Sequence, residues 1–391
     1  MIGGALRRHA LALVAVTALV AGTAAVLTSP GPRTPLDRAT ARLAALEGHG
    51  PDPAAVRFGA QLDWQTDNPA AFQRRAGVRA VVYGEFVEFP FRAEVGSWLG
   101  EKSTEVGAAD GVLMLTLEPV GGLGSVTDAA LADLTRTLRD WNTAGTPVLV
   151  RFAHEMNGSW YAWAQHPAAY VATFRRVAAA VHAAPASRIL WSPNEGGSYP
   201  FAGGRYAARP GTADFAALDT DHDGRLTQRD DPYAPYYPGD DAADWVGMSI
   251  YHFGRKYPWG ANVPPEPGKF VAKLTGTFAG ANGDERPVPD FYDRYARRTG
   301  KPITVSETSA LFNTGRAGTG ATDLQIKQAW MRQVFAPDLP ARFPRLRLIN
   351  WFEQEKDERD VPASRVDWTL THDPEVLYAF RRDAPDWLVF A

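Results

Sequence analysis

The run Pro147-Val148-Leu149-Val150-Arg151-Phe152 is mostly apolar and has the length of a buried β-strand, and a polar and aromatic segment comes after it almost at once. That segment reads His154-Glu155-Met156-Asn157-Gly158-Ser159-Trp160. It sets one carboxylic acid among a histidine, an amide and a large aromatic ring. A general acid needs surroundings of this kind, because neighbouring groups must tune its proton affinity and position it against a substrate.

Similar apolar runs recur along the chain, separated by helical patterns at residues 36–46, 129–143, 167–182 and 323–335. We expect the first helix to lie on the outside of the domain that the later segments form. Eight strands separated by helical segments predict an α/β fold, the closed (β/α)8 TIM barrel, better than an open doubly wound sheet. No G-x-G-x-x-G comes after the first strand, which argues against a dinucleotide site. The predicted strands are residues 56–62, 80–83, 111–117, 147–152, 189–192, 245–250, 303–306 and 346–351.

Two segments, residues 196–243 and 253–290, are too long for ordinary connections and are rich in Gly and Pro. In a barrel of this kind, the long loops after the strands lie at the C-terminal face, where the chemistry takes place. We therefore expect both segments to form walls of a cleft.

Composition narrows the class of protein. A net charge of -3 offers no basic surface for nucleic acid or anionic lipid. The absence of cysteine excludes disulfides, thiolate nucleophiles and Cys-ligated metals. The 12 Trp, 13 Tyr and 19 Phe are many for 391 residues and suit a carbohydrate cleft, where the C–H faces of sugars stack on flat rings.

Two glutamates end strands that should face each other across the barrel. Glu155 comes after the fourth strand and Glu307 after the seventh. Side chains at the carboxyl ends of barrel strands point toward one central opening. A single glutamate at a strand end is more often an exposed or ion-paired residue than a catalyst. Two of them in such motifs favour the two-carboxylate mechanism of a glycosidase.

A series of motifs extends over roughly residues 55 to 390: Arg151 through Trp163, Trp191-Ser192-Pro193-Asn194, Tyr237-Pro238-Gly239-Asp240, Asp244-Trp245-Val246-Gly247 with Tyr251, Pro302 through Thr308, and Asn350-Trp351-Phe352 to Asp367-Trp368. In this order they resemble glycoside hydrolase family 26. The best-known members of that family are endo-β-mannanases, and others act on mixed-linkage β-glucan or β-xylan. The resemblance implies the clan A barrel, with the acid/base on strand four and the nucleophile on strand seven.

Carried over by position, the resemblance implies that Glu155 is the acid/base and Glu307 the nucleophile. Tyr251 would hydrogen-bond the nucleophile and keep it ionised, and Arg151 would lie beneath it as a charge partner. The reaction would be a double displacement with retention, with the two carboxyl groups about 5 to 5.5 Å apart.

The same resemblance implies sugar contacts for other motif residues. His154 would contact the sugar at the point of cleavage, and Asn194 would lie in the substrate site. Trp160, Trp163 and Trp351 would be sugar platforms. For Trp163 and Trp351 a second interpretation is equally open, because large rings often fill barrel ends as core aromatics. His154 could likewise be a core histidine.

Residues 219–230 read DTDHDGRLTQRD, with acids at positions 1, 3, 5 and 12 and Gly at position 6 of the EF-hand calcium loop. We expect a structural Ca²⁺ that pins the long loop beside the cleft, while catalysis needs no cofactor. A solvated acidic turn is the alternative, since D-x-D-x-D-G also occurs by chance. The expected ligands are the carboxylates of Asp219, Asp221, Asp223 and Asp230 and the backbone carbonyl of Arg225.

The N-terminus has the pattern of an export signal, with basic residues at 7–9 before the uncharged run 10–27. We expect residues 1–35 to be a signal peptide plus a Pro-rich link, and the protein to be secreted. An uncleaved membrane anchor, with the protein facing outside, is the alternative. Residues 36–391 would form the catalytic domain, with the calcium loop in an insertion at about 196–243.

The main hypothesis is a secreted, monomeric, retaining endo-β-glycanase that acts on β-linked polysaccharide and has no nucleic-acid partner. Its leading substrate is β-1,4-mannan. One alternative is a hydrolase of β-1,3-1,4-glucan, β-1,3-xylan or an exopolysaccharide. The other is a catalytically weak barrel that binds polysaccharide.

Overall fold

The computed structural model describes residues 34–50, 52–358, 361 and 365–391, and it confirms the predicted (β/α)8 barrel. Parallel strands succeed one another in sequence order, and β1 pairs with β9 over six residues, so that the sheet closes on itself. A short C-terminal strand, β12 (Leu388–Val389), also pairs with β1. The barrel strands are β1 (Val56–Leu62), β2 (Val82–Glu88), β3 (Val112–Glu118), β4 (Val148–Phe152), β5 (Ser187–Trp191), β6 (Trp245–Ser249), β7 (Ile303–Thr308) and β9 (Leu346–Glu353).

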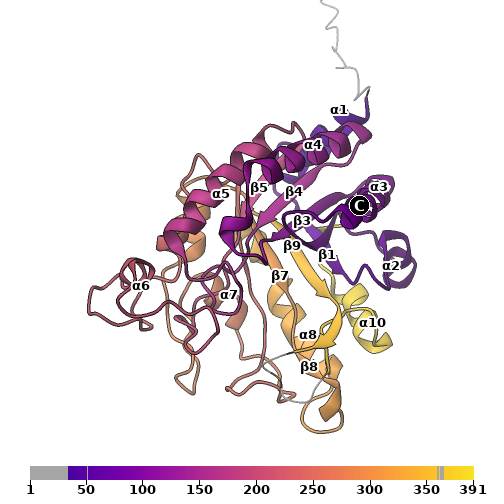
Figure 1. The fold of residues 1–391 in the computed structure, drawn as a ribbon. Coiled ribbons are helices and arrows are strands. Elements are labelled where there is room, and N and C mark those ends of the chain that lie inside the picture. The colour runs from indigo at the N-terminus through magenta and orange to yellow at the C-terminus, as the bar shows by residue number, and fades with distance from the viewer. Residues whose placement is uncertain (1–33, 51, 359–360, 362–364) are drawn as a thin grey trace, which may run out of the picture.

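Helices surround the strands (Figure 1). The patterns at 129–143, 167–182 and 323–335 are confirmed as α4, α5 and α8, and local capping explains their ends. The Thr127 side chain accepts a hydrogen bond from the Ala130 backbone at the start of α4, and Gly145, at φ 109°, ends it in a conformation that glycine adopts without strain. The helices are α1 (Pro35–Leu46), α2 (Pro69–Ala76), α3 (Ala93–Ala108), α4 (Asp128–Ala144), α5 (Pro167–His182), α6 (Ala213–Leu218), α7 (Lys269–Leu274), α8 (Asp323–Val334), α9 (Leu339–Arg342) and α10 (Pro374–Asp383).

The inside of the barrel is layered. Its N-terminal layer is an apolar cluster that includes Met114, Leu149 and Leu348, and Leu46 of α1 packs into the same cluster. The first helix therefore helps to close the N-terminal end of the barrel, which is a more specific place than the outside position expected from its amphipathic pattern.

Above the apolar layer, the interior of the barrel becomes polar. Thr116, Arg151, Ser192, Ser249 and Asn350 are all buried there. Buried polar side chains cost free energy unless they find hydrogen-bond partners. A layer of them at the carboxyl end of a barrel, where barrel enzymes have their active sites, therefore indicates a functional site.

The two long connections contain little regular structure. The segment between β5 and β6 carries short α6 and the 3-10 turn η2 (Ala234–Tyr236), and the segment after β6 carries short α7 and the π-helical turn η3 (Tyr292–Arg297). The first projects to the left in Figure 1. A buried ionic cluster ties the two segments together, since the Lys273 ammonium pairs with both Glu195 and Glu285. Removing one partner of such a cluster would leave a buried charge without compensation.

A small antiparallel sheet lies at the carboxyl end of the barrel. It consists of β8 (Phe312–Asn313), β10 (Glu355–Asp357) and β11 (Arg365–Asp367), which extend the connections after β7 and β9. Within the described part of the chain, no helix has the length and apolar character needed to cross a membrane. The expected export segment lies almost wholly at residues 1–33, outside the described residues.

Candidate active site

A sharp turn after β4 presents Glu155. Ala153 and Glu155 both have positive φ angles, 46° and 52°, which are uncommon for residues other than glycine. The Glu155 backbone N–H donates to the Ser192 carbonyl at 2.9 Å, which fixes the turn against the end of β5. Strained backbone of this kind persists only where the surrounding structure imposes it, and it gathers at active sites.

Glu307 lies at the end of β7 between a cation and a hydroxyl donor. Arg151, from β4, forms a buried ion pair with the Glu307 carboxylate. Its guanidinium is oriented by two serines, with 3.1 Å from Nε to Ser192 Oγ and 2.9 Å from Nη2 to Ser249 Oγ. Tyr251 donates its hydroxyl proton to Glu307 Oε2 at 2.7 Å. These contacts favour the ionised carboxylate, which is the form that attacks as a nucleophile.

Glu155 has the opposite setting. Burial, together with the negative charge of Glu307, raises the pKa of Glu155 to about 7, although the Arg151 charge and a hydrogen bond from Trp160 act against the shift. The Trp160 bond runs from Nε1 to Glu155 Oε2 at 3.2 Å. A carboxyl group with this pKa still carries its proton near neutral pH. The two glutamates are therefore set apart as a proton donor and an anion.

His154 is almost fully buried beside this pair. Its ring packs against those of Phe86, Tyr161 and Trp163, and Nε2 lies 3.2 Å from the Tyr161 hydroxyl. Burial lowers the pKa of His154 well below its usual range, so the ring is neutral. With so little exposed surface, its environment favours the core interpretation over a large contact with sugar.

Trp163 and Trp351 are core aromatics and not sugar platforms. Trp163 stacks on Tyr161 with ring centroids 4.4 Å apart and donates to the His154 carbonyl. Trp351 faces the outside of the barrel and packs against Phe335. Both rings are at least 99% buried, so neither offers a face to a sugar.

Side-chain alternation along β9 explains the second of these outcomes. Successive side chains of a strand point to opposite faces, so the neighbours of an outward residue point inward. Asn350 donates to the Ser306 carbonyl inside the barrel, and the Phe352 ring lies 6.0 Å from that of Tyr251. The inward aromatic at this strand end is therefore Phe352, one residue after Trp351.

Trp160 and Asn194 remain half-buried at the site. The Trp160 ring packs edge-on against Phe201 at 5.1 Å. Asn157 holds the Asn194 backbone through two 2.8 Å hydrogen bonds, one to its carbonyl and one from its N–H. No hydrogen bond joins the Asn194 side-chain amide to any described residue, which leaves it available to a polar ligand.

Comparisons with known proteins show what this chain is similar to. Residues 106–196, the segment that contains β4 and Glu155, match the family described as glycosyl hydrolase family 26. Endoglucanase H of Acetivibrio thermocellus is 22% identical over 339 residues, which cover 84% of this chain and 30% of that protein. The chain thus spans about 30% of the length of this curated relative.

Solved structures of similar fold include three glycoside hydrolase family 26 proteins. GH26C from Muricauda sp. MAR_2010_75 has a TM-score of 0.56 at 12% identity, with 92% of each chain covered. The catalytic domain of the Bacillus sp. JAMB-750 GH26 endo-β-1,4-mannanase has a TM-score of 0.53 at 16% identity, again covering 92% of each. A Cellulomonas fimi endo-β-1,4-mannanase has a TM-score of 0.55 at 16% identity, covering 92% of this chain and 76% of that one.

A third carboxyl group, which was not predicted from the sequence, lies near Glu155 and Glu307. Glu118 ends β3, beside the β4 turn, and alternation from the buried Thr116 turns its side chain inward. Burial and the charge of Glu307 raise the pKa of Glu118 to about 7, against the influence of Arg151. The position of Glu118 at the end of a predicted barrel strand could have identified it, because the same criterion selected Glu155.

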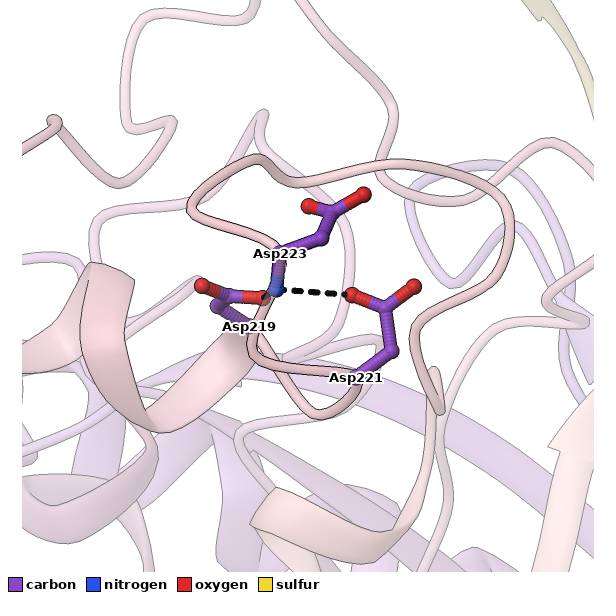
Figure 2. A group of neighbouring side chains, drawn as sticks. All are labelled: Asp219, Asp221 and Asp223. Carbon is purple, nitrogen blue, oxygen red and sulfur yellow. Dashed lines mark hydrogen bonds between the residues drawn. The ribbon is translucent and has the colours of Figure 1, made fainter.

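The predicted calcium loop brings three of its acids together. Figure 2 shows the side chains of Asp219, Asp221 and Asp223, and one carboxylate oxygen from each lies within 4.8 Å of the others. Hard carboxylate oxygens at this spacing are the donor set that Ca²⁺ prefers. The loop is also ordered by its own hydrogen bonds, since the Asp223 and Gly224 N–H groups donate to Asp219.

The fourth expected acid is not part of this cluster. Asp230 accepts hydrogen bonds from the backbone N–H groups of Thr220 and Thr227, each at 2.7 Å, so it braces the loop from within. Arg229 pairs with both Asp221 and Asp223, and its hydrogen bond lowers the pKa of Asp221. This guanidinium supplies positive charge at the outer edge of the cluster.

Proposed function

We propose that the protein is a secreted, retaining endo-glycanase that cleaves β-linked polysaccharide, with β-1,4-mannan as its leading substrate. The observation that carries the proposal is the contrast between the two glutamates: Glu307 is held as an anion by Arg151 and Tyr251, whereas Glu155 keeps its proton near neutral pH. Retaining glycosidases need one carboxyl group in each of these states.

The mechanism uses both of these states. Glu307 attacks the anomeric carbon while Glu155 gives its proton to the departing glycosidic oxygen, which leaves a covalent glycosyl-enzyme. Glu155 then takes a proton from a water molecule, whose oxygen attacks the same carbon and releases Glu307. Two inversions at one carbon give net retention. Tyr251 and Arg151 keep Glu307 oriented through both steps.

The choice of mannan is supported by the endo-β-1,4-mannanases among the proteins of similar fold. The name of the Acetivibrio thermocellus relative, an endoglucanase, makes mixed-linkage β-glucan the second candidate. Mannose and glucose, the units of these two polysaccharides, differ in the orientation of one hydroxyl. A small number of polar contacts therefore decides between the two substrates.

Reducing-sugar release from mannan, lichenan and β-1,3-xylan tests this proposal, with the Glu307→Ala variant as the control. We expect rapid release from one of the three and loss of that release in the variant. Proton NMR of the first product should show the β-anomer before mutarotation. A product that first appears as the α-anomer would contradict retention, and no release from any substrate would contradict the proposed activity.

The pH dependence should reveal the proton on Glu155. Because the pKa of Glu155 is raised to about 7, kcat/KM should fall as the pH rises through this value and the acid loses its proton. Replacing Trp160 by Phe removes a hydrogen bond that stabilises the charged carboxylate, so the alkaline limb should move to higher pH. A full pH profile of both proteins checks this. A shift to lower pH would contradict the assignment of Glu155 as the acid.

We also propose that Asp219, Asp221 and Asp223 hold a structural Ca²⁺. Its contribution would be to fix the long β5–β6 connection, not to take part in bond cleavage. Adding Ca²⁺ should raise the melting temperature by a few degrees, through preferential binding to the folded state, and EDTA should reverse the rise. Asp221→Asn should abolish the response. Asp128→Asn, which removes an exposed acid elsewhere, should preserve it. An unchanged melting temperature in the parent protein would contradict the proposal.

A further inference from the structure

A row of aromatic rings leads away from the nucleophile along the loop after β6. It starts at Tyr251, which contacts Glu307, and passes to Phe253 at a centroid distance of 5.6 Å. It continues from Phe253 to Trp259 at 6.4 Å and from Trp259 to Tyr257 at 5.8 Å. Tyr251, Phe253 and Trp259 are half-buried, whereas Tyr257 at the outer end of the row is 60% exposed.

The row has a firm backing. The buried ring of Trp368 packs edge-on against both Tyr251 at 5.2 Å and Phe253 at 5.0 Å. The Trp368 indole N–H in turn donates to Glu358 at 2.9 Å. The inner end of the row is thus continuous with the cluster around the candidate catalytic pair.

The loop that carries the row is fixed at several points. The buried Lys269 ammonium donates to the Gly254 carbonyl at 2.9 Å, and the Asn313 side chain donates to the Gly260 carbonyl at 2.9 Å. Between these glycines, the Tyr257 N–H donates to Asp284 at 3.1 Å. Rings held in place before binding lose little conformational entropy when a ligand stacks on them.

Tyr257 is unusual in its setting. Single exposed apolar side chains are common, but an aromatic ring that continues a half-buried row of rings into solvent offers a flat face to a ligand. We propose that Phe253, Trp259 and Tyr257 form distal subsites, which stack the sugar rings of a β-linked chain several units from the bond that is cleaved.

This inference rests on the proposed glycanase function and extends it to chain length. Each step of the row is comparable to the length of one pyranose in an extended chain, so an oligosaccharide lying across Tyr251 would reach Tyr257 after a few units. Exposed Arg255 and Lys256 flank the outer rings and supply hydrogen-bond donors for sugar hydroxyls. The outer rings would then favour long substrates over short ones and support endo action.

The test compares chain lengths. With the glycan that the parent protein cleaves fastest, Tyr257→Ala should lower kcat/KM for the polymer and the hexasaccharide by roughly tenfold, mainly through KM, and leave the trisaccharide nearly unchanged. Tyr378→Ala is the matched control, because Tyr378 is 65% exposed on α10. It should leave all three substrates unchanged. Equal losses on long and short substrates, or no loss, would overturn the inference.

A binding measurement separates this inference from the proposed activity. In native gels that contain soluble mannan, β-glucan or xylan, the parent protein should be retarded by one polymer, and Tyr257→Ala and Trp259→Ala should be retarded less. Retardation that is lost in these variants supports the subsites even if no polymer is hydrolysed. Retardation that is unchanged in both variants overturns the subsites even if hydrolysis is rapid, and so does the absence of retardation by all three polymers.

Discussion

Glu307→Ala should reduce polysaccharide hydrolysis by roughly 10⁴-fold or more, because the variant has no carboxylate to form the covalent intermediate. The substitution also leaves the Arg151 guanidinium buried without its partner. An uncompensated buried charge costs about 3–5 kcal/mol, so the melting temperature should fall as well. Glu307→Gln, which preserves side-chain volume and one acceptor oxygen, should lose as much activity with a smaller loss of stability.

Azide distinguishes a lost nucleophile from a damaged fold. In Glu307→Ala a small anion fits the space left by the carboxylate and is adjacent to Arg151. It should restore cleavage of an activated aryl β-glycoside and give the α-glycosyl azide, with inverted configuration, because it attacks directly. A β-glycosyl azide from this variant would mean that another residue is the nucleophile.

Glu155→Ala should lower hydrolysis of polysaccharide by about 10²–10⁴-fold, the usual contribution of a general acid. The sugar leaving group of a polysaccharide is a poor one and needs the proton. A dinitrophenyl glycoside does not, so the variant should still form the glycosyl-enzyme from it at close to the parent rate. Hydrolysis of this glycosyl-enzyme should be slow, because no base activates the water. The intermediate should therefore accumulate, and both kcat and KM for the dinitrophenyl glycoside should fall.

The configuration of the azide product is again diagnostic. In Glu155→Ala the covalent intermediate still forms on Glu307, so azide attacks that intermediate and should give the β-glycosyl azide. The two alanine variants thus predict opposite product configurations under the same conditions. Identical configurations from both would contradict the assignment of separate roles. Fast formation and slow breakdown of the glycosyl-enzyme should give an initial burst of dinitrophenol in Glu155→Ala. Absence of this burst would contradict the role of Glu155 as the acid/base.

Periodicity predicted the barrel well because each strand and helix carries its own pattern. The strand at residues 56–62 coincides with β1, and the helix at 167–182 coincides with α5. The second strand was placed too early, at 80–83, since β2 begins at Val82 and continues into Phe86 and Glu88. Its C-terminal half carries the charged residues Glu85 and Glu88 and two half-buried positions, so hydrophobicity alone did not reveal it.

Site residues were predictable where the chemistry is tied to a strand end. Glu155 and Glu307 could be found because inward-facing side chains at the carboxyl ends of barrel strands share one opening. It was harder to predict which aromatic rings face the site, because this depends on the face of the strand that each ring occupies. Phe352 points inward, whereas the neighbouring Trp351 points outward. The aromatic row from Tyr251 to Tyr257 has no strand or helix period, so periodicity in the sequence did not reveal it.

Local periodicity and residue type were enough to predict the alternation of strands and helices, the two acids and the spacing of the calcium loop. Tertiary contacts gave the two acids different surroundings. That difference arises from Arg151, Tyr251 and burial, which act on the carboxylates through space from other strands. The outward orientation of Trp351 and the hydrogen bonds that keep Asp230 out of the acidic cluster likewise depend on contacts that residue spacing alone does not reveal.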